Sequence, residues 1–230
     1  MQTLNLNDIL TSHPYPGRGI MLGRSADNTK GVIAYFIMGR SENSRNRIFE
    51  VTEDGIRTKA FDESKMVDPS LIIYHPVRVV GDDTVVTNGD QTDTVRDGLL
   101  AGEVFAQSLR RRCFEPDGPN WTPRVSGVRY ACGGYQMSIL KAADAEGTAC
   151  TRNFFEYAPK NGVGRFISTY EGFGSPLPSF HGEPVQMDLP QMTAKEYAEA
   201  IWNALNADNK VSLYVKLGDE VIIINKHQEV

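Results

Sequence analysis

The sequence has few of the residues that build disulfide frameworks and metal sites. Its three cysteines, Cys113, Cys132 and Cys150, are odd in number and widely spaced, and no two of them form a CxxC pair. This pattern argues against a disulfide framework and fits a reducing compartment, so we expect a cytoplasmic protein in which each cysteine is a small buried hydrophobe. The four histidines are scattered without an HExxH-type spacing, and nothing in the sequence indicates a metal or a cofactor.

Long apolar runs are also lacking. No segment approaches the roughly 20 apolar residues that cross a membrane, and residues 1–14, MQTLNLNDILTSHP, lack the basic start and apolar core of a secretory signal. We interpret residues 1–14 as a loosely held lead-in. Positive charge is in deficit, since 29 acidic residues outnumber 24 basic ones and give a net charge of -5. This balance argues against general nucleic-acid binding, although a local basic patch could still hold one nucleotide.

The positive charge that is present gathers in residues 15–47. The basic residues of this segment are Arg18, Arg24, Lys30, Arg40, Arg45 and Arg47. The first two lie among glycines, where backbone N–H groups can approach an anion closely. The apolar run 31–38 separates them from the last three, and if the chain folds back there as a hairpin, we expect the two arginine groups to meet at one end of it. The segment is either a solvated basic face or an anion site suited to phosphate.

Patterns of apolar residues predict a chain built mainly of strands. The run 32–38 is apolar on both alternating faces, which indicates a strand buried on both sides. The other predicted strands are 20–23, 48–51, 56–61, 71–74, 77–80, 84–87, 125–131, 135–142, 149–157, 165–170, 211–217 and 220–225. Gly218 and Asp219 between the last two strands predict a tight hairpin.

Two helices are predicted. Helical spacing of apolar residues runs from about Thr94 to Arg112, where Thr94 and Asp97 resemble a capping box. We interpret the arginines at 110–112 as serving capping and solubility in the last turn of this helix. The second helix is predicted at 193–207 and begins with a Thr-x-x-Glu capping box.

Many strands in hairpins and only two helices indicate an α+β fold. Because several strands are apolar on both faces, two sheets packed face to face explain the pattern better than one sheet open to water. With helices over the outer faces, the predicted architecture is a four-layer α/β/β/α sandwich. No shift in composition marks a boundary, so we expect residues 1–230 to form one domain.

Three polar clusters stand at the ends of predicted strands. Residues 88–94, Asn-Gly-Asp-Gln-Thr-Asp-Thr, are either a turn with a helix N-cap or a helix N-terminus that holds an anion or ribose hydroxyls. Arg124 follows Thr122 and Pro123 at the mouth of a strand. Tyr170 and Glu171 end another strand, and they are either an acid–base couple or an ordinary strand terminus.

The order of these motifs resembles one known family. The motifs are Tyr15-x-Gly-Arg18, Gly23-Arg24, Arg40-Ser41, Asn46-Arg47, Val80-Gly-Asp82, Asn88-Gly89, Thr92-Asp-Thr94, Thr122-Pro-Arg124 and Ser168-Thr-Tyr-Glu171. Together they resemble the archaeal-type inosine monophosphate (IMP) cyclohydrolase family from about Tyr15 to Glu171. Residues 172–230 match less closely, so the function of that region stays open. The segment 42–45 departs in spacing, and either Arg45 or Arg47 takes the family position.

The resemblance implies the fold of the N-terminal nucleophile hydrolases, which is the same four-layer sandwich, but not their chemistry. Those enzymes need Ser, Thr or Cys as the first residue, and Met1 followed by Gln2 predicts no such nucleophile here. The implied reaction is the last step of purine biosynthesis, closure of formyl-AICAR (5-formamidoimidazole-4-carboxamide ribonucleotide) to IMP with loss of water and without a cofactor. Purine nucleotides are then the binding partners, with neither nucleic acid nor membrane, and we expect a homo-oligomer.

The resemblance also suggests which residues form the site. Arg18, Arg24, Arg40 and Arg47 are expected to contact the phosphate and the formyl oxygen, Asn88, Asp90 and Thr92 to hold ribose or base edges, and Arg124 to give a further phosphate contact. Tyr170 and Glu171 are the expected acid–base residues, with Tyr35 and Tyr74 as alternates, although Tyr35 also fits the core. Two other functions stay open: an amide hydrolase on the same fold, and a purine-nucleotide-binding regulatory protein without catalysis.

Overall fold

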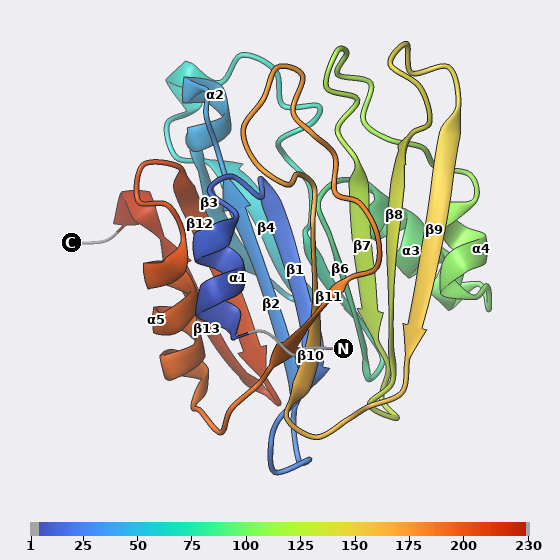
Figure 1. Ribbon diagram of the computed structural model, residues 1–230, viewed down its shortest axis with the longest axis vertical. Coiled ribbons are helices and arrows are strands. Elements are labelled where there is room, and N and C mark those ends of the chain that lie inside the picture. The colour runs from blue at the N-terminus through green and yellow to red at the C-terminus, as the bar shows by residue number, and fades with distance from the viewer. Residues whose placement is uncertain (1–4, 229–230) are drawn as a thin grey trace.

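Two antiparallel sheets form the centre of the protein, as seen in a computed structural model that describes residues 5–228 (Figure 1). The first sheet has six strands in the order β11-β10-β1-β2-β12-β13. These strands are β1 (Arg18–Arg24), β2 (Gly31–Met38), β10 (Val163–Ser168), β11 (Val185–Asp188), β12 (Lys210–Leu217) and β13 (Glu220–Asn225). The second sheet has seven strands in sequence order. They are β3 (Arg47–Thr52), β4 (Gly55–Ala60), β5 (Val77–Val80), β6 (Asp83–Thr87), β7 (Arg124–Arg129), β8 (Tyr135–Ala142) and β9 (Cys150–Tyr157).

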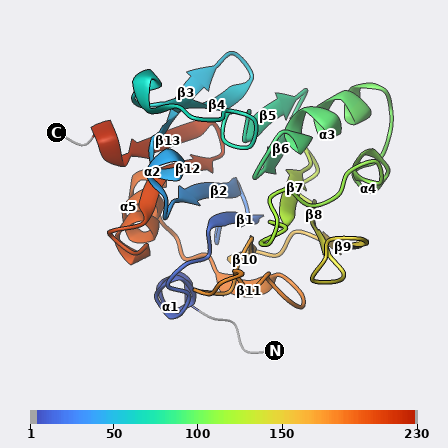
Figure 2. The same ribbon diagram turned by 90° about the horizontal axis from the view of Figure 1, so that it is seen from above.

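Helices cover the outer face of each sheet. Helices α1 (Leu6–Ser12) and α5 (Ala194–Ala204) lie on one side of the molecule, and α3 (Gln91–Leu100) and α4 (Phe105–Leu109) lie on the opposite side (Figure 2). The short elements are α2 (Glu42–Arg45) and two 3-10 turns, Glu63–Lys65 and Lys226–Gln228. The predicted α+β class with two antiparallel sheets is confirmed, and the order helix, sheet, sheet, helix is compatible with the predicted sandwich.

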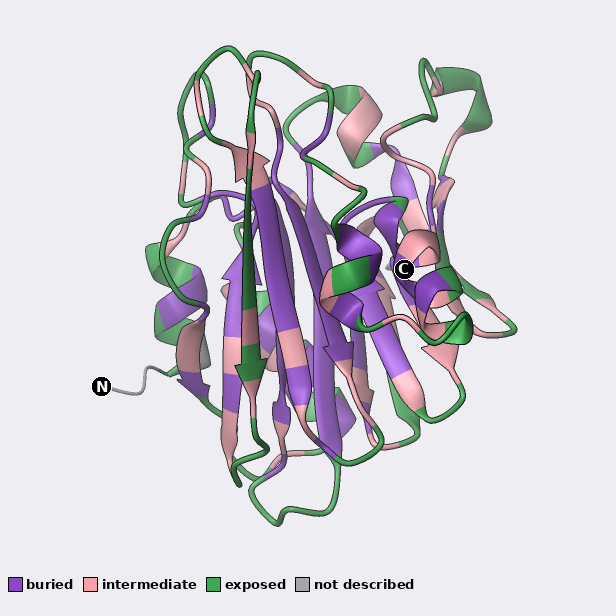
Figure 3. Cartoon of the chain, turned by 90° about the vertical axis from the view of Figure 1, so that its right-hand side faces the viewer, coloured by how far each residue is buried: buried purple, intermediate pink, exposed green. Residues whose placement is uncertain are grey.

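Strand β2 shows why two layers must cover the first sheet. All eight of its residues are buried. Ile33, Tyr35 and Ile37 enter the core between the two sheets, whereas Ala34 and Phe36 enter the core beneath α1 and α5. A strand that is apolar on both alternating faces needs a partner on each face, so the prediction that this strand is buried on both sides is confirmed. Figure 3 shows buried residues along the central strands and exposed residues at the loops.

The helix predicted at 94–112 is two helices. Helix α3 begins at Gln91 rather than Thr94, and Asp90 is its N-cap, so the capping box predicted for Thr94 and Asp97 is wrong. The helix ends at Leu100, before Gly102 with φ +81°, and α4 follows as a separate helix from Phe105. A positive φ ends helical geometry, and glycine adopts it without steric cost. The second predicted helix is confirmed as α5, with the capping box of Thr193 and Glu196 in place.

Several further predictions need correction. Residues 71–74 form turns rather than a strand, and strand β11 was not predicted. Cys113 and Cys132 are exposed and Cys150 is partly exposed, so the three cysteines are not buried hydrophobes. Residues 5–14 are not a loose lead-in, because Ile9 and Leu10 of α1 are buried against the layer that contains α5, while residues 1–4 lie outside the described part. Within residues 5–228, no helix is long and apolar enough to span a membrane.

Candidate active site

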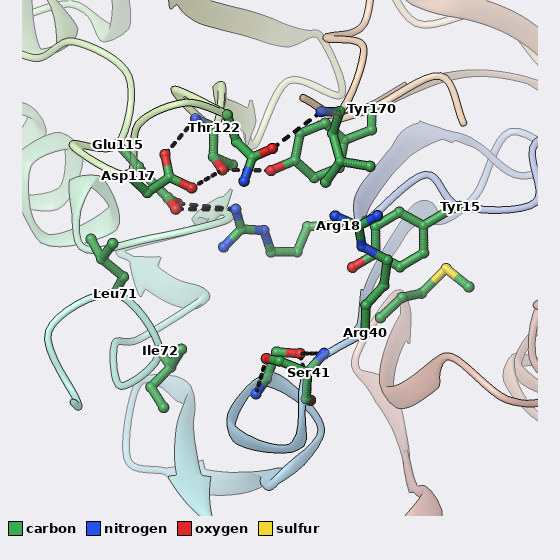
Figure 4. Close-up of a pocket in the computed structure, with 15 residues that line it drawn as sticks. Tyr15, Arg18, Arg40, Ser41, Leu71, Ile72, Glu115, Asp117, Thr122 and Tyr170 are labelled. Carbon is green, nitrogen blue, oxygen red and sulfur yellow. Dashed lines mark hydrogen bonds and ion pairs between the residues drawn. The ribbon is translucent and has the colours of Figure 1, made fainter. Parts of the chain in front are cut away.

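A pocket of about 330 Å³ opens at one end of the β1–β2 hairpin (Figure 4). Its polar wall contains Tyr15, Arg18, Arg40, Ser41, Ser44, Glu115, Asp117, Asn120, Thr122 and Tyr170, and its apolar lining includes Leu71, Ile72 and Leu177. Figure 4 shows the Arg18 side chain directed toward Glu115 and Asp117, with open space between it and Ser41. Charged, hydroxyl and apolar groups therefore converge on one concave surface, which is the usual composition of a small-molecule site.

The two arginines of strand β1 lie at its opposite ends. The β1–β2 pairing sets Arg18 opposite Ile37 and Arg24 opposite Gly31, and a strand of this length spans about 20 Å. Arg18 therefore reaches the pocket, whereas Arg24 lies at the far turn, where it donates hydrogen bonds to Asn28. The predicted hairpin is confirmed, but the expectation that both arginine groups meet at one end of it is wrong for Arg24.

A buried ion pair joins Arg18 to Glu115. Arg18 is 9% exposed and Glu115 is 3% exposed, and Arg18 Nη2 lies 3.1 Å and 3.2 Å from the two carboxylate oxygens. Burial raises the pKa of the Glu115 carboxyl above its ordinary value, although the Arg18 and Arg124 charges oppose this rise. A fixed buried cation can stabilise a developing oxyanion, and a carboxylate whose pKa is raised is a stronger base than an ordinary one.

Local hydrogen bonds fix the loop that carries Glu115 and Asp117. Glu115 N donates to Thr122 O at 2.8 Å, and Asn120 N donates to Asp117 O at 3.2 Å. Thr122 N also donates to Asp117 Oδ1 at 2.6 Å. These bonds close residues 115–122 into a compact loop, so both carboxyl groups are held in place at the pocket wall.

The hydroxyl of Tyr170 begins a chain of hydrogen bonds that ends at a carboxylate. Thr122 Oγ1 donates to Asp117 Oδ2 and shares a short hydrogen bond with Tyr170 Oη. A threonine hydroxyl has one proton, so Tyr170 is the donor to Thr122. Burial raises the pKa of Tyr170 to about 12, with the Arg18 charge opposing the rise. Tyr170 therefore stays protonated at neutral pH and can act as a hydrogen-bond or proton donor.

A second pair of phenols lies deeper, behind the pocket. Tyr35 Oη and Tyr74 Oη are 2.8 Å apart, and both residues are buried. Tyr74 N donates to Thr58 Oγ1 at 2.8 Å, which fixes its main chain. Burial raises the pKa of Tyr35 well above its ordinary value, and the Arg18 charge opposes this rise. Tyr35 thus belongs to the core between the sheets, while its hydroxyl is electrostatically coupled to the pocket.

Arg47 and Arg45 have different surroundings. Arg47 is 2% exposed, its Nε donates to Ser44 O at 2.8 Å, and its Nη1 is buried without a hydrogen-bond partner among residues 5–228. Arg45 is exposed, and it donates to Gly39 O and to Asn209 Oδ1. A buried guanidinium with an unused donor is a ready partner for an anion. Ser44 lines the pocket, so this hydrogen bond links the buried Arg47 to the pocket wall.

Arg40 lies at the exposed rim of the pocket. Its guanidinium is 5.2 Å from the centre of the Tyr15 ring, in the geometry of a cation–π contact. Tyr15 in turn stacks between Tyr170, at 6.1 Å, and Phe173, at 5.6 Å. Arg40 Nη1 also donates to Gly174 O at 3.4 Å, so the rim is linked to the loop that follows Tyr170.

The segment 88–94 forms a buried scaffold. Asn88 is fully buried, donates to Pro123 O, and accepts from Gln91 and from Val125 N. Thr92 is also fully buried and bonds to Thr87 and Gly89. The polar side-chain atoms of Asn88 and Thr92 are buried and already hydrogen bonded within the protein. These two side chains are therefore not placed to contact a ribose or a base directly.

Asp90 and Arg124 form a charged cluster beside the pocket. Arg124 Nη1 lies 2.6 Å from Asp90 Oδ1, and Arg112 Nη2 lies 2.5 Å from Asp90 Oδ2. Arg112 was interpreted as a capping residue, but it lies past the end of α4 and pairs with this aspartate instead. Arg124 also acts on the Glu115 carboxyl electrostatically, so the cluster supports the pocket wall from behind.

Glu171 faces away from the pocket. Its carboxylate accepts from His181 N at 2.7 Å and lies 3.3 Å from His181 Nδ1. Successive residues of an extended chain point to opposite sides, so Tyr170 enters the pocket and its neighbour cannot. The expected Tyr170–Glu171 couple is therefore not brought together, and the carboxylates near the phenol are Asp117 and Glu115.

Sequence reasoning gave no site role to seven polar residues of the wall. Three of them stand in the quoted motifs, namely Tyr15, Ser41 and Thr122, and four do not, namely Ser44, Glu115, Asp117 and Asn120. One signal was available for the loop, since two acidic residues stand among Pro116, Pro119 and Pro123 just before Arg124. Nothing local showed that this loop faces Arg18, which lies 97 positions earlier than Glu115. Within residues 5–228, no group of three or more His, Cys, Asp or Glu side chains is arranged to hold a metal ion.

Comparisons with known proteins agree with the resemblance seen in the sequence. The family model described as "IMP cyclohydrolase-like protein" matches residues 15–221. The chain belongs to this family. The IMP cyclohydrolase of Methanosphaera stadtmanae is 29% identical over 195 residues, which cover 82% of this chain and 85% of that protein. The IMP cyclohydrolases of Methanococcus aeolicus and Methanopyrus kandleri are 27% and 29% identical, each over 68% of this chain and over 74% and 75% of their own lengths.

Proposed function

We propose that this family member is an IMP cyclohydrolase, which closes the purine ring of formyl-AICAR to give IMP. The observation that carries the proposal is the pocket in which the buried Arg18–Glu115 ion pair meets the hydroxyl of Tyr170. The reaction needs an oxyanion stabiliser and groups that move protons, and these side chains supply both. The family membership supplies the substrate class.

The reaction is an intramolecular condensation. The carboxamide nitrogen attacks the formyl carbon of the neighbouring formamide, a C–N bond forms, and the carbonyl oxygen becomes a hydroxyl. The C–O bond then breaks, and the oxygen leaves as water with one proton from the carboxamide nitrogen and one from the formamide nitrogen. Holding both groups in attack geometry can supply about 7–11 kcal/mol in the best intramolecular cases. Positioning is therefore the largest task of the pocket.

We assign the reacting groups to the part of the pocket around Arg18. The Arg18 guanidinium would polarise the formyl oxygen and stabilise the negative charge that forms on it. The hydroxyl of Tyr170, which donates to Thr122 in the free site, would turn to the substrate and donate its proton to the departing oxygen. Glu115, with a pKa raised by burial, would accept the proton from the attacking nitrogen. Tyr35 and Tyr74 would hold the position of Arg18 from behind.

We assign the phosphate to the side of the pocket lined by Arg40 and Ser41. Arg40 is exposed at the rim, where a charged group enters first, and the buried Nη1 of Arg47, next to Ser44, has no hydrogen-bond partner in the described part of the chain. Arginine is suited to phosphate because its planar group donates two parallel hydrogen bonds. In this proposal Asn88, Thr92, Asp90 and Arg124 support the loop of Glu115 rather than touch the substrate, and Arg24 has no role.

Two further proposals concern the fold and the number of domains. Helix, sheet, sheet, helix is the order of N-terminal nucleophile hydrolases, and we propose that this chain shares their fold but uses Arg18, Glu115 and Tyr170 in place of their nucleophile. The family match runs from residue 15 to 221 without a break, which supports one domain. A structural comparison of the Cα trace with those hydrolases tests the first proposal, and a single cooperative unfolding transition tests the second.

A direct assay tests the function. The purified protein is incubated with formyl-AICAR in buffer containing a chelator, and the product is followed by purine absorbance and identified as IMP by its mass. We expect an acceleration over buffer that the Tyr170→Phe variant largely loses. Absence of acceleration between pH 6 and 9 would refute the function, and binding of IMP without turnover would favour the regulatory alternative.

A further inference from the structure

Strand β9 is an open edge of the seven-stranded sheet. It has eight residues, Thr151 to Phe154 are exposed, and it pairs with β8 on one side only. The other edge of that sheet is closed differently, because the Asn225 side chain accepts from Phe49 N and donates to Phe49 O, as a paired strand would. Proteins usually blunt such edges, and β9 contains neither a proline nor a bulge.

The free backbone groups of β9 follow from its register with β8. Ala143 N donates to Ala149 O at 2.9 Å, so this is a hydrogen-bonded pair of the antiparallel ladder. The regular register of all eight β8–β9 pairs then makes every odd-numbered residue of β9 a hydrogen-bonded one. It follows that the N–H and C=O groups of Arg152, Phe154 and Glu156 point away from β8, toward the open edge.

The side chains of these three residues form a self-complementary row. Phe154 is 37% exposed, and its ring contacts Phe105 of α4 edge-on at 6.4 Å. Arg152 lies two residues before Phe154, and Glu156 lies two residues after it. Side chains two apart on a strand share one face, so opposite charges stand at equal distances on either side of one partly exposed aromatic ring.

We propose that β9 pairs with β9 of a second copy of this chain, antiparallel, with Phe154 on the two-fold axis. In this register Arg152 lies opposite Glu156 of the second copy at both ends, and the two Phe154 rings meet at the centre. The open backbone groups of Arg152, Phe154 and Glu156 then exchange hydrogen bonds across the axis, and the two seven-stranded sheets join into one continuous sheet. Within one copy the Arg152 side chain donates to Arg112 O and the Glu156 side chain accepts from Gln136 Nε2. A two-fold contact uses the same patch on both copies, and this row has that symmetry.

A second copy fits this edge better than an unrelated peptide does. An unrelated strand would need an acidic residue opposite Arg152 and a basic one opposite Glu156 at a spacing of four, whereas a second copy supplies both from the same sequence. Directly opposed charges of unlike sign stabilise an antiparallel pair, and like charges destabilise it. The pairing lies outside the pocket and does not depend on the proposed reaction.

Charge reversal tests both the surface and the register. Arg152→Glu alone sets glutamate opposite glutamate, and Glu156→Arg alone sets arginine opposite arginine, whereas the double variant restores opposite charges at both ends. The mass in solution is measured by light scattering and sedimentation over a concentration series. We expect the parent to contain dimers, each single variant to raise the dimer dissociation constant about 10-fold or more, and the double variant to return it to within about threefold of the parent.

Controls separate pairing from folding and from charge in general. Lys195→Glu changes an exposed charge on α5 and should leave the mass unchanged, and the thermal transition of every variant shows that it folds. A parent that stays monomeric up to about 100 µM would overturn the proposal, as would single variants with the dimer constant of the parent. Single variants that dissociate without rescue in the double variant would overturn the register with Phe154 on the axis.

Discussion

At the scale of single residues, neighbours in the sequence have different surroundings. Tyr170 enters the pocket while Glu171 faces His181 at the surface. Arg47 is buried beside the pocket wall, while Arg45, two positions earlier, is exposed at the end of a four-residue helix. One step along an extended chain reverses the direction of a side chain, which separates Tyr170 from Glu171. Arg45 and Arg47 differ because helix α2 ends at Arg45 and strand β3 begins at Arg47. Residue type alone therefore does not identify which of two adjacent candidates is functional.

The pair Tyr170 and Glu171 gives the sharpest test of the proposed proton donor. Tyr170→Phe removes one hydroxyl from the hydrogen-bond chain to Asp117, and we expect kcat to fall about 100-fold or more, as for loss of a general acid. Glu171→Gln is the matched control and should change kcat less than about twofold, since its carboxylate faces away from the pocket. Steady-state kinetics on formyl-AICAR measure both. Equal losses in the two variants would contradict the assignment.

Arg47 and Arg45 form a second matched pair. Arg47→Met removes the buried donor that has no partner among residues 5–228, and we expect IMP affinity to fall about 10- to 150-fold, the value of a charge-assisted hydrogen bond of about 1.5–3 kcal/mol. Arg45→Met should leave the affinity within about twofold. Calorimetric titration with IMP measures both changes. If Arg45→Met has the larger effect, the exposed arginine holds the phosphate.

Ionisation of Glu115 should make the free energy of unfolding fall as pH rises. Burial raises the pKa of Glu115 above the ordinary value of 4.5, so the folded protein holds this proton more tightly than the unfolded chain does. The resulting stabilisation is fully present below pH 4.5 and is lost as pH rises through the folded value. The free energy of unfolding of the parent should thus fall relative to Glu115→Gln above pH 4.5, by at most about 1.4 kcal/mol per pH unit.

Urea unfolding of the parent and the variant at a series of pH values measures this difference. Glu103→Gln is the control with the opposite pH dependence, because hydrogen bonds from Arg111 lower the pKa of the partly exposed Glu103. The stabilisation from that pair is present above the ordinary carboxyl pKa and is lost as pH falls. A parent that gains stability relative to Glu115→Gln as pH rises would show that Arg18 outweighs burial.

At the scale of elements, short connections position the site. The β1–β2 hairpin places Arg18 at the same end as Arg40, and the loop 115–122 presents Glu115 and Asp117 to that end. The connection between α3 and α4 also matters, because α4 leads directly into this loop. The turn between α3 and α4 depends on Gly102, whose φ is +81°. The surroundings of Gly102 leave open space for an added Cβ.

Gly102→Ala tests whether backbone conformation alone divides the predicted helix. A side chain would meet nothing within 4 Å there, so the cost comes from the positive φ, and we expect a loss of stability of about 1 kcal/mol. Gly172→Ala is the matched control, because it also has open space but no positive φ, and it should not destabilise the protein. Urea unfolding measures both, and equal effects would contradict the explanation.

At the scale of the whole molecule, three cores hold four layers together. One core lies between the sheets, and one lies beneath the helices on each outer face. The N-terminal helix α1 belongs to the core beneath α5, so the chain before the pocket contributes to the outer layer. This is why residues 5–14 are part of the fold rather than a separate lead-in.

Leu10→Ala tests whether helix α1 belongs to the core beneath α5. Leu10 is 2% exposed, and truncating a buried leucine costs about 2–5 kcal/mol. Thr11→Ala, at an exposed position of the same helix, should cost less than about 1 kcal/mol. Thermal and urea unfolding measure both. A loosely held α1 would instead give two variants of equal stability, or a separate early transition for Leu10→Ala.

Much of the fold could be predicted because the spacing of apolar residues along a segment indicates which of its faces are buried. The run 32–38 is apolar on both faces, and this alone required a layer on each side. The capping box at Thr193 and the turn at Gly218 fixed the ends of α5 and of β12 in the same local way. The predictions failed where helical spacing continued across a glycine, as at Gly102, because periodicity does not report the sign of φ.

The sequence by itself determined the two packed sheets, the hairpins and the family resemblance, since each depends on residues that are near one another or on an ordered set of motifs. Only the tertiary structure decided which side chains meet. Arg18 and Glu115 are 97 positions apart, and Tyr170 and Thr122 are 48 apart. Such pairs form because sheet register and loop closure bring segments that are far apart in the sequence to one end of a strand. Local sequence patterns do not show which of these distant segments meet.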